Sequence, residues 1–284
     1  MAAALLAAAL TSGVRAQSAT TSSDLEQTLA RVGDRVEQWY ARAQSIVAEE
    51  RVAIQPLEYD LRPAGFPRRL AYELRLAWGP DARADALPDA SVLRELLRVN
   101  GRPARPDDEP GCMDPKTVSP EPLAMLLESR RAEHRFSIAG RATVDRTAAW
   151  MIDYRGVEAG PPDIEWRDEC VSVSLPGRSR GRIWIDAATY DVLRLDERLT
   201  GSFEFEVPRE YVRRGAARSM IIERADTSIR YRRVQFEEPT ETLLLPATID
   251  TVTVVRGGGM QRYRITRELS DYRRFLTSGR IVIE

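Results

Sequence analysis

Apolar residues recur at helical spacing over the first well-patterned segment of the chain. They are separated by three or four positions and form one face of a helix, at Leu25, Leu29, Val32, Val36, Tyr40, Ala43 and Val47. Ser23-Asp24-Leu25-Glu26 fits a capping box at a helix start. The pattern predicts a helix over about 24–48 that covers a sheet. A coiled-coil dimer is the weaker interpretation, because the pattern lasts barely three heptads.

Beyond residue 51 the spacing changes to that of strands. Leu70 to Trp78 alternates large apolar residues with polar or small ones, and Phe203 to Val207 does the same. Asn100-Gly101, Pro176-Gly177 and Gly257-Gly258-Gly259 are turn signals between such segments. Further strands are predicted over 52–60, 93–99, 133–139, 146–155, 169–175, 181–187, 191–200, 226–236, 248–256 and 260–270.

Short strands with tight links favour an antiparallel meander of the α+β class, since a parallel sheet needs a helix between most strands. A second, short helix is predicted over 121–130, after Ser119-Pro120. The arginine-rich stretch 208–225 interrupts the meander and is predicted to be a solvated loop or helical insertion. A mobile lid or a membrane-surface contact is the alternative for that stretch.

Residues 1–16 have the features of a secretory signal peptide. A short apolar stretch is followed by Val14 and Ala16 at the −3 and −1 positions of a cleavage site before Gln17. No Lys or Arg precedes the apolar stretch, so we expect the true start upstream or misassigned; an ordinary alanine-rich N-terminus is the alternative. Residues 17–23 are predicted to be a flexible lead-in to a single domain over 24–284. The signal peptide predicts that this domain lies in the periplasm or is secreted by a bacterium.

Export changes the interpretation of the only two cysteines, Cys112 and Cys170. Two cysteines in an exported protein are a natural disulfide pair, whereas two buried free thiols are the alternative. The bond would tie the loop 101–120, rich in Pro, Asp and Glu, back to the sheet.

Composition excludes several classes of site. The net charge is −1, which does not indicate a general nucleic-acid binder. One histidine and two cysteines exclude multi-histidine zinc sites and iron–sulfur clusters built from this chain alone, and no metal or cofactor is predicted. The acidic residues Asp107, Asp108, Glu109 and Asp114 are interpreted as a solvated loop rather than a calcium site, because they lack the spacing of a known calcium loop.

Gly177-Arg178-Ser179-Arg180-Gly181 matches the G-x-S-x-G pattern of serine hydrolases, with His134 as the only candidate base. A nucleophile elbow needs a helix after the serine, whereas a strand is predicted here. A hydrolase that uses Ser179 and His134 is therefore kept only as a remote alternative.

Several short motifs occur in a familiar order along the chain, which resembles a group of uncharacterised exported proteins of acidobacterial type. The motifs are Ile46-Val47-Ala48-Glu49-Glu50-Arg51, Gly181-Arg182-Ile183-Trp184-Ile185-Asp186, Asp191-Val192-Leu193-Arg194, Leu244-Leu245-Pro246 and Ser270-Asp271-Tyr272-Arg273-Arg274-Phe275. In architecture these proteins resemble the LolA/LolB lipoprotein-carrier superfamily. That resemblance implies a curved antiparallel sheet or incomplete β-barrel, with the long N-terminal helix and the short second helix packed on its concave side. It transfers no binding role to any residue.

The leading hypothesis is a non-enzymatic binding protein that holds a lipid, a lipoprotein acyl chain or another apolar ligand between sheet and helix. Tyr72, Trp78 and Trp150 are the candidate lining residues. The alternative is a structural or adaptor protein of the cell envelope, with a solid core and a protein partner. An open apolar cavity under the helix would favour the carrier, and a filled one would favour the adaptor.

Overall fold

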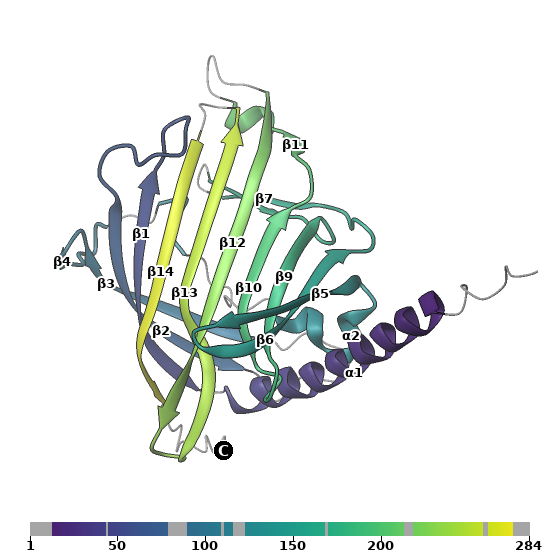
Figure 1. Ribbon diagram of the computed structural model, residues 1–284. Coiled ribbons are helices and arrows are strands. Elements are labelled where there is room, and N and C mark those ends of the chain that lie inside the picture. Colours follow the sequence, from purple (N-terminus) through teal and green to yellow (C-terminus); the bar gives the residue numbers. More distant parts are fainter. Residues whose placement is uncertain are drawn as a thin grey trace, which may run out of the picture.

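The computed structural model describes residues 13–43, 45–78, 90–108, 111–115, 123–167, 170–212, 218–257 and 261–274; side chains are described from Asp24 onward, apart from 77–78 and 90–91. Residues 1–12, which hold most of the predicted signal peptide, lie outside these ranges. The structure has one large antiparallel sheet, a separate two-stranded hairpin and a set of helices (Figure 1).

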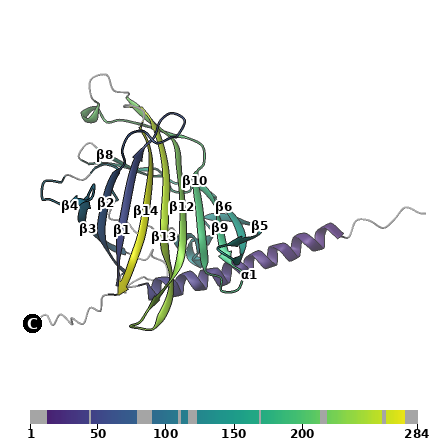
Figure 2. The ribbon, with the colours of Figure 1, turned by 60° about the vertical axis from the view of Figure 1, so that its left-hand side comes forward.

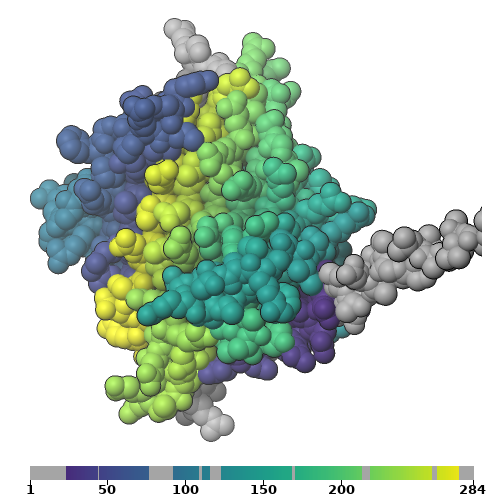
Figure 3. All heavy atoms as spheres, viewed as in Figure 1, coloured from purple at the N-terminus to yellow at the C-terminus, as the bar shows by residue number. Residues whose placement is uncertain are grey.

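The main sheet is open and curved, as an incomplete barrel requires. Its order is β4-β3-β2-β1-β14-β13-β12-β10-β9-β6-β5, with β11 beside β12, so β4 and β5 form opposite edges. The strands are β1 Ile46–Pro56, β2 Arg68–Trp78, β3 Ala90–Val99, β4 Arg102–Pro103, β5 His134–Val144, β6 Thr147–Gly156, β9 Ser179–Asp186, β10 Val192–Leu199, β11 Phe203–Glu206, β12 Ser219–Phe236, β13 Glu241–Arg256 and β14 Gln261–Arg274. In Figure 3 the yellow to green atoms of β14, β13 and β12 lie side by side in the upper part of the view, and teal atoms cross in front of them lower down.

Most strands pair with a neighbour in sequence, which confirms the predicted antiparallel arrangement. Two features were not predicted from local patterns. β1 pairs with β14, so the first strand and the last lie side by side in the middle of the sheet. After β4 the chain crosses to the opposite edge, where β5 begins. Both depend on pairing between segments remote in sequence, which alternation alone does not encode.

The long helix α1 spans Gly13–Arg42 and lies along one end of the sheet (Figures 1 and 2). It therefore also runs through 17–23, predicted as a lead-in. The predicted C-terminal end at residue 48 is wrong, because Ile46 to Glu50 belong to β1. Val47 continues the helical spacing only by coincidence. The same segment alternates as a strand and pairs with both β2 and β14, and this pairing outweighs the helical pattern. Among the described residues, no helix is both long and apolar enough to span a membrane.

The second predicted helix is divided in two. A 3₁₀ turn, η1, spans Leu123–Leu126, and the short helix α2 spans Glu128–Arg131. The predicted residues 121–122 lie outside the described residues. η1 buries Leu123, Met125 and Leu126 in the same core as α1.

Both helical segments lie on one face of the sheet, which we call the inner face. Its main core joins apolar side chains of α1 and η1 to side chains of strands far apart in the sheet order, such as Leu74 of β2 and Ile152 of β6. Strands so distant can share one core only if the sheet curves around it. The inner face is therefore the concave one, and the predicted half-barrel with helices on its concave side agrees with this packing.

The predicted insertion 208–225 is shorter than expected. η2 spans Arg209–Tyr211, residues 213–217 lie outside the description, and β12 already begins at Ser219. The Tyr211 ring stacks on Trp166, with ring centroids 4.8 Å apart. Trp166 belongs to a hairpin outside the main sheet, formed by β7 Asp163–Arg167 and β8 Cys170–Ser174.

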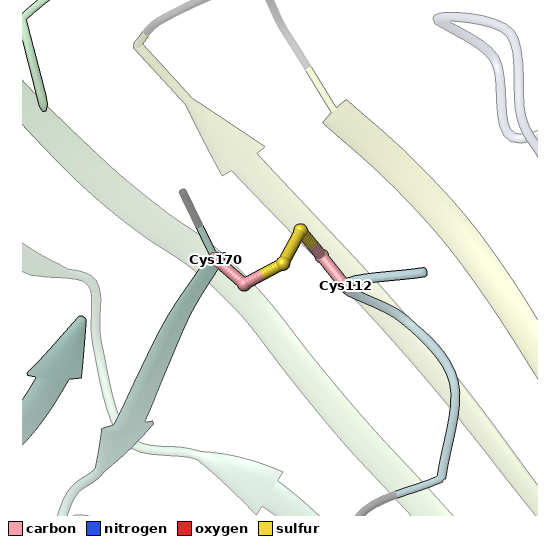
Figure 4. The surroundings of a disulfide bond; sticks show 2 residues. All are labelled: Cys112 and Cys170. Carbon is pink, nitrogen blue, oxygen red and sulfur yellow. A yellow bond between two sulfur atoms is a disulfide. The ribbon is translucent and has the colours of Figure 1, made fainter. Parts of the chain in front are cut away.

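The disulfide between Cys112 and Cys170 is present, as predicted (Figure 4). Their Cα atoms lie 5.2 Å apart, within the range of ordinary disulfides. The bond ties the loop after β4 to the start of β8, and Met113 next to it packs on a small apolar cluster of β1, β2 and β3. Acidic residues of this loop form ion pairs, Asp108 with Arg102 and Asp114 with Arg68.

We expect the disulfide to contribute measurably to stability. It joins residues 58 positions apart, which corresponds to about 4 kcal/mol in the chain-entropy account. The double variant Cys112→Ser/Cys170→Ser should lose roughly that amount in urea unfolding, and the wild-type mass should lie about 2 Da below the reduced mass. Unchanged unfolding together with two titratable thiols in the wild type would contradict the pairing.

Candidate functional site on the concave face

The helix–sheet interface is the place where the sequence predicts a ligand. The inward side of α1 carries Leu29, Val32, Val36 and Trp39, all buried, with Val32 fully inaccessible. Trp39 is also fixed by a hydrogen bond, because its indole Nε1 donates to the carbonyl oxygen of Leu244 at 2.7 Å. A tryptophan held at both its ring and its N–H is a fixed part of a packed core rather than an adaptable pocket wall.

A glycine allows the two helical segments to approach closely. A Cβ on Gly33 of α1 would lie 3.0 Å from the carbonyl oxygen of Leu126 and 2.5 Å from Nη2 of Arg131. The first of these neighbours is backbone and cannot move aside easily. α1, η1 and α2 therefore form one closely packed cover over this end of the concave face.

Ion pairs hold α1 at the rim of the sheet. Arg35 pairs with Asp191 at 2.8 Å, and Arg42 pairs with Glu241 at 3.0 Å. Arg31 donates a hydrogen bond from Nη1 to the hydroxyl of Tyr190 at 2.6 Å. Because the arginines are partly exposed, each pair contributes at most about 1 kcal/mol. They orient the helix, whereas apolar burial supplies most of its attachment.

Among the residues that the structure describes, little space is left between α1 and the sheet. The cavity between Val36, Trp39, Leu123, Tyr231 and Leu244 has a volume of about 20 Å³. That is close to the volume needed for a single water molecule. In this structure the interface is thus filled by the protein's own side chains.

Farther along the inner face, a buried ion cluster separates the main core from the smaller one. Glu50 of β1 is completely inaccessible and accepts hydrogen bonds from Nε of Arg94 at 2.6 Å and from Nε of Arg267 at 2.5 Å. Arg94 is 4% exposed and Arg267 is 16% exposed. Two guanidinium groups thus share one carboxylate beneath the surface of the sheet.

Sequence reasoning missed this cluster. Glu49 and Glu50 directly follow the helix predicted over 24–48, whereas in the structure they lie on opposite faces of β1. Glu49 faces outward and pairs with Arg51. The available signal was alternation: Glu50 occupies an inward position of the same stripe as Ile46, Val52 and Ile54.

Tyr72, a predicted lining residue, lies beside this ion cluster on β2, opposite Glu50. Its side chain is buried, and burial together with the charge of Asp114 raises its pKa to about 12. Asp114 is itself held by Arg68 at 3.0 Å. Tyr72 therefore stands in a polar neighbourhood, although its ring packs in the smaller apolar cluster.

The other two predicted lining residues are placed elsewhere. Trp150 lies on β6, far from β2 in the sheet order, and the guanidinium carbon of Arg141 sits 4.1 Å from its ring centroid. Trp78 ends β2, and its side chain lies outside the described residues. Tyr72 and Trp150 thus belong to different parts of the concave face, and the lining role of all three residues stays a prediction.

The arrangement expected of a hydrolase does not form around Ser179. A strand, β9, follows the serine, so no helix N-terminus lies behind it. His134 lies on β5, separated from β9 by β6, which places the two backbones roughly 10 Å apart. Among the described residues, no hydrogen bond joins their side chains.

We expect the buried ion cluster to be costly to break. Glu50→Gln leaves two arginines beneath the surface without their shared counter-charge, so the free energy of unfolding should fall by about 3–5 kcal/mol. The matched control is Glu49→Gln on the outer face, which should cost less than about 1 kcal/mol. Urea unfolding of both variants measures the difference, and equal losses would rule out the assigned burial of Glu50.

Tyr72 should make stability decrease at high pH. The unfolded chain loses the tyrosine proton near its ordinary pKa of 10.0, whereas the folded chain retains it to about 12. Stability due to this residue should therefore be fully present below pH 10 and fall as the pH rises through that window. Tyr72→Phe should flatten this decline in unfolding experiments, whereas Tyr59→Phe, at a residue 83% exposed, should not. The same decline in both variants would contradict the assignment.

Comparison with known proteins identifies similar folds. No family model and no curated protein matches the chain. Among solved structures, an outer membrane lipoprotein-sorting protein domain from Vibrio parahaemolyticus is 8% identical over 90% of this chain and 95% of that one, with a TM-score of 0.44. A DUF1329 family protein from Desulfovibrio piger is 10% identical over 89% and 94%, with a TM-score of 0.43. A LolA superfamily protein from Nitrosomonas europaea is 8% identical over 89% and 96%, with a TM-score of 0.34. Each of these three structures is aligned over most of this chain, at 8–10% sequence identity.

Proposed function

We propose that the chain is a non-enzymatic binding protein of the cell envelope that acts as an adaptor, with a solid half-barrel core and a protein partner on its surface. The observation that supports this function is the filled interface between α1 and the sheet, where the cavity measures only about 20 Å³. An acyl chain needs many times that volume. In this conformation, the core is occupied by Trp39 and its neighbours instead.

The compartment is part of the proposal. A disulfide between Cys112 and Cys170 persists in oxidising surroundings such as the periplasm and the extracellular space. The predicted signal peptide over residues 1–16 points to the same place. A non-enzymatic role fits the position of Ser179 ahead of a strand, with His134 two strands away.

A carrier of lipid or of a lipoprotein acyl chain is the second candidate, and one observation favours it. The cover of α1 is held at its rim by partly exposed ion pairs, which water can replace at little cost. A ligand could then enter where α1 now packs, but only if the helix leaves the sheet. Release of α1 would expose Leu29, Val32, Val36 and Trp39, each worth about 1.5–3 kcal/mol when buried.

Native mass spectrometry of residues 17–284, exported to an oxidising periplasm, distinguishes the two functions. The adaptor predicts the mass of the protein alone, which stays unchanged after incubation with phospholipid. The carrier predicts an adduct that is lost on denaturation and recovered by lipid extraction. Such an adduct would overturn the solid-core proposal. Val36→Trp provides the control, because it should weaken any adduct that forms beneath α1.

A further inference from the structure

Four arginines form a row on the outer, convex face of the sheet. Arg135 of β5 is the direct cross-strand partner of Arg155 of β6, which partners Arg180 of β9, which in turn partners Arg198 of β10. All four are exposed. We call this row the arginine ladder. With adjacent strands about 4.8 Å apart, the ladder extends about 14 Å across the sheet.

The ladder is unfavourable for the protein alone. Like charges directly opposite each other on neighbouring strands destabilise a sheet. None of the four arginines forms an ion pair with a residue that the structure describes. Four neighbouring positive charges therefore remain without a counter-charge from the described part of the chain.

The carboxylates nearest the arginine ladder already form ion pairs with other arginines. In the next row, Asp153 pairs with Arg182, and Asp196 pairs with Arg194. On β12, the cross-strand partner of Arg198 is Asp226, which pairs with Arg224. The carboxylates nearest the ladder on the outer face are thus engaged with other arginines.

The ladder also lines a groove. The groove has a volume of about 960 Å³ and includes all four ladder arginines, with Trp184 at its side. Its walls are strands paired on both sides except at β5, so the guanidinium groups project from a rigid frame. A rigid row of forked donors suits carboxylates, which guanidinium groups bind in a bidentate manner.

We propose that the arginine ladder binds an extended acidic segment of a partner protein; this inference rests on the adaptor function and names the chemistry of its partner. Alternate side chains of an extended chain lie on one side about 7 Å apart. Three acidic residues at alternate positions therefore span about 14 Å, which matches the length of the ladder. A hollowed groove accommodates such a segment, whereas a flat lipid surface meets protruding side chains first.

Stability separates this role from a structural one. Replacing Arg155 and Arg180 with glutamate turns their contacts with Arg135 and Arg198 into opposite-charge pairs and leaves one like-charge contact, between the two replaced positions. The double variant Arg155→Glu/Arg180→Glu should therefore keep or raise the melting temperature while it loses binding. A structural role for the ladder predicts a lower melting temperature instead.

The test is fluorescence anisotropy with a labelled peptide of four Glu-Thr repeats and a matched peptide of four Gln-Thr repeats. The wild type should bind the Glu-Thr peptide, more weakly as salt increases, and should not bind the Gln-Thr peptide. Arg155→Glu/Arg180→Glu should weaken binding roughly tenfold or more. The control Arg69→Glu makes the same kind of substitution at one exposed arginine of β2, with half the charge change of the double variant, and should bind like the wild type.

Three outcomes would overturn the inference: no binding of the Glu-Thr peptide, equal binding by the double variant, or an equal loss in Arg69→Glu. Binding to vesicles of phosphatidylglycerol in phosphatidylcholine is measured in parallel. Ladder-dependent binding to these vesicles without peptide binding would assign the ladder to a lipid surface and also overturn it. A lipid adduct in native mass spectrometry with intact peptide binding would contradict only the solid core. A mass without any adduct, together with no binding of the Glu-Thr peptide, would contradict only the proposal of an acidic partner.

Discussion

Burial of the apolar side of α1 on the concave face is the interaction that the remaining structure depends on. A curved sheet gains stability only if its inner face is removed from water, and here strands from both halves of the sheet reach the same helix. Gly33 permits the cover formed by α1 and η1 to close, and Trp39 fixes the helix by a hydrogen bond to Leu244. The cover fills the space in which a carrier would hold its ligand. A curved sheet with a helix on its concave face can therefore form a solid frame.

Charge is used in opposite ways on the two faces of the sheet. On the inner face, Glu50 forms ion pairs with both Arg94 and Arg267 beneath the surface, where an unpaired charge would be prohibitive. On the outer face, water solvates the unpaired guanidinium groups of the ladder from Arg135 to Arg198. The contacts between these like charges still lower the stability of the fold. The first arrangement serves the fold. The second is unfavourable for the fold and becomes useful only when an anionic partner is present, which is why the two are assigned different roles.

Much of the fold could be predicted from sequence, and the errors have physical causes. Alternation from Leu70 to Trp78 identified β2, and the export signal made the pairing of Cys112 with Cys170 the natural choice. The end of α1 was placed too late because Val47 satisfies both helical and strand spacing, and only pairing with β2 and β14 decides between them. The candidate site was harder to predict from the sequence. Neither Glu50 nor the ladder is a sequence motif, since each consists of residues that become neighbours only through strand register.

Hydrogen exchange of backbone amides tests the central claim, a solid core closed by α1, most directly. The amides of residues 28–42 are compared with those of β12 and β13 under native conditions. If the helix is an integral part of the core, its amides should exchange through the same global opening as the central strands, and urea should affect both alike. Exchange of α1 orders of magnitude faster than that of the strands, unaffected by their stability, would show that the helix opens separately. That result would contradict the solid core and favour a lid over a ligand site.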